Sequence, residues 1–107
     1  LINNALKFTQ NGNVNVIAKL YAEEDDTATV YFEIVDTGIG IPEDELQYIY
    51  DPFFRASNTK NYEGYGIGLP LTRNIIRMHN GKIFVNSIQD QGTTVQITIP
   101  TWKPEVV

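Results

Sequence analysis

The chain has 107 residues, 42% hydrophobic and 20% charged, a size and composition that fit one compact domain. Eight lysines and arginines against 13 aspartates and glutamates give a formal net charge of −5, which argues against a nucleic-acid-binding platform. The absence of cysteine excludes disulfide scaffolds, zinc–thiolate sites and cysteine nucleophiles. No apolar run approaches the roughly 18 residues of a membrane span, so we expect no membrane contact.

The first third of the chain predicts one helix followed by two strands. Residues 1–8 have helical spacing but no capping residue ahead of them, so we expect the chain to begin inside its first helix. Alternation of apolar and polar residues from Val14 to Tyr21 indicates a strand with one mostly apolar face. The acidic run at 23–27 indicates a hairpin loop, and the β-branched and aromatic residues of 29–36 indicate a second strand.

The middle of the chain predicts two helices separated by a long irregular segment. Pro42 suits the first turn of a short helix over residues 42–50. Residues 51–65 show no period, and an irregular stretch of about 15 residues in a compact domain is more typical of a functional lid than of a plain connection. Helical spacing returns at 67–78.

Within residues 67–78, Leu71, Ile75 and Met78 recur at helical spacing and define the predicted buried face. The side chains left for solvent are Arg73, Asn74 and Arg77.

The last part of the chain predicts two strands, 83–88 and 93–99, joined by a hairpin at 89–92 and followed by a loose tail over 101–107. Hairpin-joined strand pairs with helices between them predict an α+β fold. We expect a two-layer α/β sandwich, with a mixed, mostly antiparallel sheet and helices on one face.

Five of the eight glycines fall in two clusters. Gly38 and Gly40 follow the second predicted strand, and Gly64, Gly66 and Gly68 close the irregular segment. Glycine lacks a Cβ atom, so a flat ring or a phosphate can approach the backbone closely, although a plain loop hinge is an alternative. The second cluster is neither a dinucleotide fingerprint nor a P-loop, because no strand leads directly into it and no glycine precedes Lys-Ser or Lys-Thr.

Three polar residues suit a nucleotide. Asp36 ends an apolar strand beside the first two glycines, where its carboxylate is placed to accept a hydrogen bond from an amino-bearing aromatic ring. Asn4 and Lys7 share a helix face and offer an amide oxygen for a hard cation and an ammonium group for phosphate. The alternatives are an Asp36 that only stabilises a turn and an Asn4 that is merely tolerated in a helix.

Four segments resemble, in the same order, the ATP-binding motifs of sensor histidine kinases. They are an N box at residues 4–9 (NALKFT), a G1 box at 36–41 (DTGIGI), an F box at 51–55 (DPFFR) and a G2 box at 64–69 (GYGIGL). They span nearly the whole chain, and their joint occurrence is far more specific than any single glycine motif. The resemblance implies the ATP-binding catalytic domain (HATPase_c) of the GHKL superfamily, with its Bergerat-type sandwich.

The resemblance also implies a role for each matching residue. Asn4 would coordinate the Mg²⁺ that bridges the ATP phosphates, and Lys7 and Arg55 would be the catalytic residues that contact the phosphates. Asp36 would receive the adenine amino group. The other implied nucleotide-binding residues, which line the pocket or let the lid fold over the phosphates, are Phe8, Gly38, Gly40, Ile41, Phe53, Phe54, Gly64, Gly66, Gly68, Leu69 and Thr94.

Lys60 and Tyr65 lie in the lid segment, and Pro70 lies in the helix that follows it. Lys60 is a second candidate for phosphate contact, with simple solvation as the alternative. Tyr65 stands where the family commonly has a small residue, which leaves the closed geometry of the lid open. Pro70 also departs from the family pattern, but it falls in the first turn of its helix, where proline is tolerated.

Histidine kinases transfer the γ-phosphoryl group of ATP to a histidine on a separate dimerising helical hairpin. His79, the only histidine here, is expected at a helix C-terminus, so it does not suit the acceptor role. The implied partners are therefore the dimerisation and phosphotransfer domain of the same protein and, indirectly, the receiver domain of a response regulator. The implied location of the domain is cytoplasmic. The resemblance is compatible with a parent protein that is anchored in the inner membrane.

Two other functions stay open from the sequence. One is a nucleotide-gated interaction module, such as an anti-sigma-like regulator or a degenerate kinase, and the other is a GHKL ATPase. The position that would best distinguish a histidine kinase from a GHKL ATPase is four residues before Asn4, just ahead of Leu1. Lys7, the DPFFR segment and the short lid favour the kinase branch.

Overall fold

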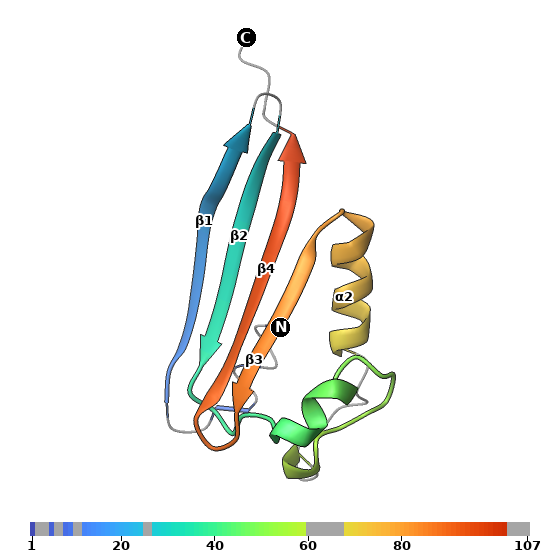
Figure 1. The fold of residues 1–107 in the computed structure, drawn as a ribbon. Helices are drawn as coiled ribbons and strands as arrows, with labels where there is room; N and C mark the ends of the chain where they lie inside the picture. Colours follow the sequence, from blue (N-terminus) through green and yellow to red (C-terminus); the bar gives the residue numbers. More distant parts are fainter. Residues whose placement is uncertain (2–4, 6–7, 10–11, 25–26, 60–67, 103–107) are drawn as a thin grey trace.

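The computed structural model shows a long four-stranded sheet with an α-helix beside one outer strand and two short 3-10 helices at one end of the sheet (Figure 1). It describes residues 1, 5, 8–9, 12–24, 27–59 and 68–102. This arrangement confirms the predicted two-layer α+β sandwich. The described elements are strands β1 (Val14–Glu24), β2 (Thr27–Asp36), β3 (Lys82–Ile88) and β4 (Gly92–Trp102), 3-10 helices η1 (Glu43–Tyr48) and η2 (Ser57–Thr59), and helix α2 (Gly68–Met78).

The strand order is β1-β2-β4-β3, and all three pairings among the described strands are antiparallel. Val16, Ile34 and Val95 face one another across β1, β2 and β4, as the period-2 pattern requires. Two residues further along β2, Asp36 pairs with Thr93 at the end of the ladder. The end of β2 therefore lies beside the hairpin that joins β3 to β4.

Several element boundaries differ from the sequence prediction. β1 continues to Glu24 and β2 begins at Thr27, so the loop between them is shorter than the predicted loop at 23–27. The pairing of β1 with β2 shifts register between Leu20 and Ala22. The predicted helix over 42–50 is a 3-10 helix, η1.

The tail was expected to be loose from residue 101, and this is wrong for its first two residues. β4 continues to Trp102, which pairs with Thr27, because β2 is long enough to supply partners there. The Thr101 hydroxyl donates to the Ala28 carbonyl at 3.1 Å. Residues 103–107 lie outside the described part of the chain.

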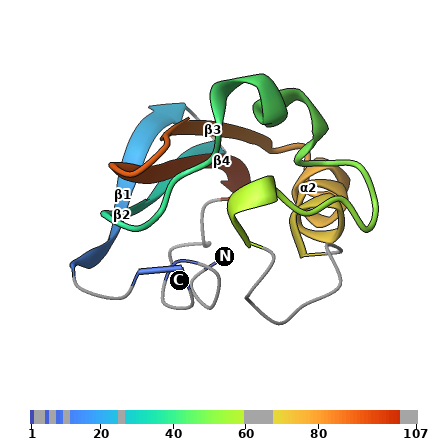
Figure 2. The same ribbon diagram turned by 90° about the horizontal axis from the view of Figure 1, so that it is seen from below.

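The core lies between the sheet and the helical layer. Its buried members are Ala5, Ile34, Ile76, Val95 and Ile97. Ala5 belongs to the predicted first helix, and its amide donates to the Leu1 carbonyl at 3.0 Å. Figure 2 shows α2 on one side of the curved sheet, at its β3 end. None of the described helices is long and apolar enough to cross a membrane.

Helix α2 forms where predicted, but its predicted buried face is wrong. Leu71, Ile75 and Met78 are 56%, 47% and 80% exposed, whereas Ile76 is only 5% exposed. Arg73, predicted to face solvent, is half-buried. The reason is that α2 carries apolar residues around more than one side, so helical spacing does not decide which side meets the sheet.

Two adjacent isoleucines test this orientation of α2. Ile76→Ala should lower the free energy of unfolding by about 2–5 kcal/mol, because it leaves a cavity in the core. Ile75→Ala, a matched control on the exposed side, should cost less than about 1 kcal/mol. Urea denaturation of both variants measures the difference, and equal losses would contradict the orientation.

Candidate nucleotide-binding site

The site is built around the Asp36 carboxylate at the end of β2. Its Oδ1 atom accepts hydrogen bonds from the Gly38 amide at 2.9 Å and the Thr93 amide at 3.2 Å. Both bonds that the described part of the chain makes to this carboxylate end on Oδ1. The half-buried side chain is therefore held in one orientation, with Oδ2 left to accept from a ligand.

The glycines after Asp36 have a structural cause besides any ligand. A Cβ atom on Gly38 would lie 2.7 Å from the Thr9 hydroxyl and would collide with the Phe8 carbonyl. That carbonyl accepts from the Ile39 amide at 3.1 Å, which joins the end of the first helical segment to this loop. Gly40 is buried with φ of +66°, and a Cβ there would collide with the Ile88 carbonyl. Bare backbone at both positions lets neighbouring segments of the chain approach closely.

Ser87 supports the same loop and was missed in the sequence. Its hydroxyl oxygen accepts from the Ile41 amide at 2.8 Å, and its hydroxyl donates to the Gly92 carbonyl at 3.0 Å. The Thr93 hydroxyl lies 2.7 Å away and completes the cluster. The sequence signal that could have revealed Ser87 is a polar residue at an inward position of a strand whose other inward positions are apolar.

Thr94 was predicted to join the adenine pocket, but the structure does not bring it to Asp36. Asp36 pairs with Thr93, and Thr94 pairs with Val35. Because side chains alternate along a strand, Thr94 lies on the opposite face of the sheet from Asp36. The residue of this pair that lies beside the carboxylate is Thr93, one position earlier.

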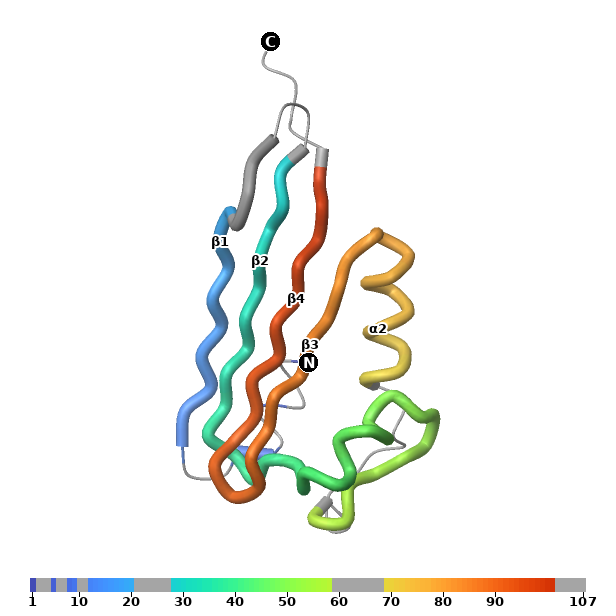
Figure 3. The backbone as a smooth tube through the Cα atoms, viewed as in Figure 1, coloured from blue at the N-terminus to red at the C-terminus, as the bar shows by residue number. Residues whose placement is uncertain are grey.

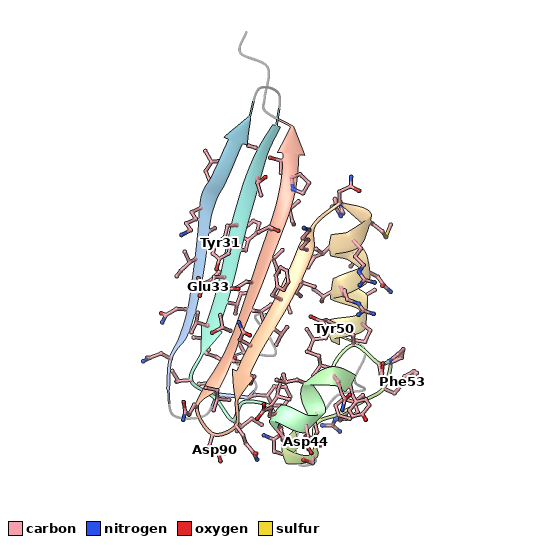
Figure 4. The ribbon with its side chains drawn as sticks, in the orientation of Figure 1. Tyr31, Glu33, Asp44, Tyr50, Phe53 and Asp90 are labelled. Carbon is pink, nitrogen blue, oxygen red and sulfur yellow. The ribbon has the colours of Figure 1, made fainter. Side chains whose placement is uncertain are left out.

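The two phenylalanines of the F box occupy different environments, although both were expected to anchor the near edge of the lid. Phe54 is half-buried and packs against the Tyr48 ring, with 5.6 Å between ring centroids. Phe53 is 72% exposed and has φ of 66°, an unusual backbone conformation for an aromatic residue. Figure 4 shows Phe53 at the outer edge of this segment.

Tyr50 connects the F box to α2. The Arg73 guanidinium lies 4.4 Å from the centroid of the Tyr50 ring, a cation–π contact that explains why Arg73 is half-buried. Burial raises the pKa of the Tyr50 phenol, and the charges of Arg73 and Arg77 oppose part of this rise. The residue just before the F box is thereby held against α2.

The remaining predicted site residues divide into two groups. Arg55 is half-buried directly after the F box phenylalanines, and Gly68 and Leu69 begin α2. The other group lies outside the described residues and comprises Asn4, Lys7, Lys60, Gly64, Tyr65 and Gly66.

The described residues contain no group of three or more His, Cys, Asp or Glu side chains that could hold a metal ion. The implied ligand of Mg²⁺, Asn4, is one of the residues outside this part. The described residues fit the adenine end of a nucleotide better than its metal-binding end, because a fixed carboxylate oxygen lies beside two glycines. The arrangement can recognise an amino-bearing ring.

The four-stranded antiparallel sheet with its helices has the fold of the ATP-binding domains of the GHKL class. The sequence profile described as "Histidine kinase-, DNA gyrase B-, and HSP90-like ATPase" (HATPase_c) matches residues 1–103. The chain therefore belongs to the HATPase_c family. Sensor kinases are among the relatives of the chain, which confirms the histidine kinase resemblance.

Among curated proteins, the chain is 41% identical over 100 residues to the adaptive-response sensory kinase SasA of Rippkaea orientalis. This match covers 94% of the chain and 25% of SasA. It is 39% identical over 102 residues to the autoinducer 2 sensor kinase/phosphatase LuxQ of Vibrio cholerae, covering 94% of the chain and 12% of LuxQ. The chain thus spans a quarter or less of these two relatives.

Two solved structures are also similar. The mycobacterial sensor histidine kinase MprB matches with a TM-score of 0.69 and 28% identity, covering 97% of this chain and 66% of that one. Full-length ShkA in complex with AMPPNP matches with a TM-score of 0.70 and 27% identity. That match covers 91% of this chain and 19% of ShkA.

The raised pKa of Tyr50 predicts a pH dependence of stability. Between the unfolded-state pKa, about 10, and the higher folded-state pKa, the folded protein holds a proton that the unfolded chain releases. The contribution of Tyr50 to stability is therefore present below about pH 10 and is lost as pH rises through the folded-state value. Tyr50→Phe should make the loss of stability above about pH 10 shallower, as measured by urea denaturation between pH 8 and 11.

Tyr48→Phe is the control for this experiment, because it removes a phenol from an exposed ring in the same segment. A pH profile of Tyr50→Phe that matches that of the unaltered protein would contradict the interpretation.

Proposed function

We propose that this chain binds Mg-ATP and supplies the γ-phosphoryl group for autophosphorylation of a histidine on a separate dimerisation domain, in two-component signal transduction. The observation that carries the proposal is the Asp36 carboxylate, held by the amides of Gly38 and Thr93 beside a buried Gly40. Support comes from the family match and from relatives that are sensor kinases. A similar structure was solved with an ATP analogue, AMPPNP.

Adenine recognition follows from the geometry of the carboxylate. With Oδ1 of Asp36 held by two backbone amides, Oδ2 accepts from the exocyclic amino group of adenine. Guanine presents a carbonyl oxygen at the corresponding ring position, so two acceptors would face each other there. A buried acceptor left without a donor costs about 1–3 kcal/mol, which is the basis for discrimination.

The triphosphate is assigned to the residues of the N, F and G2 boxes. Phosphoryl transfer depends mainly on positioning and on neutralising the developing charge. We assign Lys7 and Arg55 to the phosphates and Asn4 to Mg²⁺, which when bound would neutralise charge on the phosphate oxygens. The backbone amides at the start of α2, next to Gly68, suit the same anionic group.

The acceptor histidine and the further partners belong to other domains. The Nδ1 atom of His79 donates to the Ile75 carbonyl at 2.8 Å, a contact that suits a structural residue at the end of α2. We assign the acceptor to the dimerisation and phosphotransfer domain of the same protein, and the next transfer to the receiver domain of a response regulator. The cytoplasm, which supplies ATP, is the proposed location.

Asp36→Asn tests adenine recognition. The substitution keeps the shape of the side chain but replaces one carboxylate oxygen with an amide nitrogen, which cannot accept a hydrogen bond from adenine. ATP affinity should therefore fall about 10- to 100-fold. Calorimetric titration with ATP and GTP measures the effect. The proposal fails if Asp36→Asn binds ATP as tightly as the unaltered chain does. It also fails if the unaltered chain shows no preference for ATP over GTP.

A second experiment tests phosphoryl transfer. The chain joined to the phosphotransfer domain of its parent protein should, with γ-labelled ATP, acquire a label that is acid-labile and base-stable, as expected for phosphohistidine. Release of free phosphate without protein label would indicate a superfamily ATPase. ATP binding with neither outcome would indicate a nucleotide-gated interaction module.

A further inference from the structure

A row of polar side chains crosses three strands at the end of the sheet where Asp36 lies. Asp36 on β2 pairs with Thr93 on β4, and Thr93 pairs with Ser87 on β3. Directly opposed residues place their side chains on the same face of a sheet. Figure 3 shows the hairpin between β3 and β4 beside the segment that follows β2. Ser87 therefore lies one strand beyond the partner of Asp36.

The Ser87 hydroxyl joins the two segments that frame Asp36. Its oxygen accepts from the Ile41 amide at 2.8 Å, in the loop that follows Asp36. Its other two contacts reach the start of β4: the hydroxyl donates to the Gly92 carbonyl at 3.0 Å and lies 2.7 Å from the Thr93 hydroxyl. One side chain thus bonds to the loop and to the start of β4 at the same time.

The same two segments supply the donors that orient the Asp36 carboxylate. The Gly38 amide of the loop and the Thr93 amide of β4 both donate to Oδ1, at 2.9 and 3.2 Å. These bonds depend on distance and angle, so they weaken if the loop and the start of β4 move apart. By bonding to both segments, Ser87 keeps the two donors in place around one oxygen.

Packing alone does not account for a serine at residue 87. The preceding inward positions of β3 are Ile83 and Val85, which pack against the core. A serine at the next inward position buries less apolar surface than either of them would. It also brings a hydroxyl that must find hydrogen-bond partners when half-buried. The partners it has belong to the frame of the carboxylate, which favours a role in the site.

We propose that Ser87 is a positioning residue for base recognition, an inference that rests on the proposed ATP-binding function. By holding the loop against the start of β4, Ser87 keeps the Asp36 carboxylate in one orientation, with Oδ2 directed at the ligand. A carboxylate that can turn meets the amino group of adenine less well and distinguishes it less from the carbonyl of guanine. Ser87 acts through Asp36 and does not itself recognise the base.

Ser87→Ala tests this role because it removes the hydroxyl and leaves Asp36 unchanged. ATP affinity should fall about 3- to 10-fold, whereas GTP affinity should change by less than about twofold. The preference for ATP over GTP should therefore shrink by nearly the same factor as ATP affinity falls. Adenosine should lose as much affinity as ATP, because the effect lies at the base. NMR titration of the full chain measures all three ligands.

Three further variants complete the test. Ser87→Thr keeps a hydroxyl and should retain the preference for ATP within about twofold. Asn86→Ala removes a polar group from the exposed side of the same strand and should leave every affinity unchanged. If Ser87→Ala does not fold, as judged by thermal unfolding, Ser87→Cys carries the test, because a thiol has a similar volume but forms only weak hydrogen bonds.

An unchanged preference for ATP over GTP in the folded Ser87→Ala or Ser87→Cys variant would overturn the inference. Equal losses of ATP and GTP affinity would overturn it too, because they would mean that Ser87 serves only stability. Either result leaves the proposed function intact when the unaltered chain itself prefers ATP. An unaltered chain without that preference would refute the proposed function.

Discussion

The pairing of β2 with β4 is the constraint on which the site depends. This register sets Asp36 opposite Thr93, and the Thr93 amide bonds to the Asp36 carboxylate across 57 positions of sequence. A shift of one residue would move every side chain of β2 to the other face of the sheet, and would turn Asp36 away from its loop together with Ile34 from the core. The residues that bury the core thus also orient the carboxylate.

The loop after Asp36 is held from several directions at once. Phe8 bonds to it from the first helical segment, Ser87 from β3 and Asn58 from η2. Each contact ends on a backbone group of residues 39–41. Glycines in this loop admit neighbouring backbone as well as any ligand, so a single sequence feature serves both packing and recognition. Such convergence is what a preorganised binding site requires.

The sequence predicted the order of elements, the fold class and the position of Asp36, because these depend on local periodicity and on motifs. The orientation of α2 was wrong, since Leu71 and Ile76 both lie on apolar sides and only tertiary packing selects between them. The register places Thr93, and not the predicted Thr94, beside Asp36, because the alternation of a strand defines two faces but not which face meets the site. Periodicity is silent on such choices.

Polar support residues were harder to predict than the motif residues. Ser87 and Asn58 make bonds to segments 46 and 18 positions away, and nothing in their immediate neighbours signals those partners. Phe53 was assigned an anchoring role by its motif, whereas its left-handed backbone directs it outward. Long-range hydrogen bonds and local backbone geometry are properties of the assembled fold.

The register shift between Leu20 and Ala22 affects the tendency of the domain to aggregate with copies of itself. β1 is an outer strand of the described sheet, and it carries exposed Val16, Ile17 and Leu20. A long outer strand with exposed apolar side chains is a template for pairing with another chain. An irregularity within the strand increases its local twist and interrupts the regular spacing of its free amides and carbonyls. The register shift therefore disfavours edge-to-edge pairing of β1 with another copy of the chain.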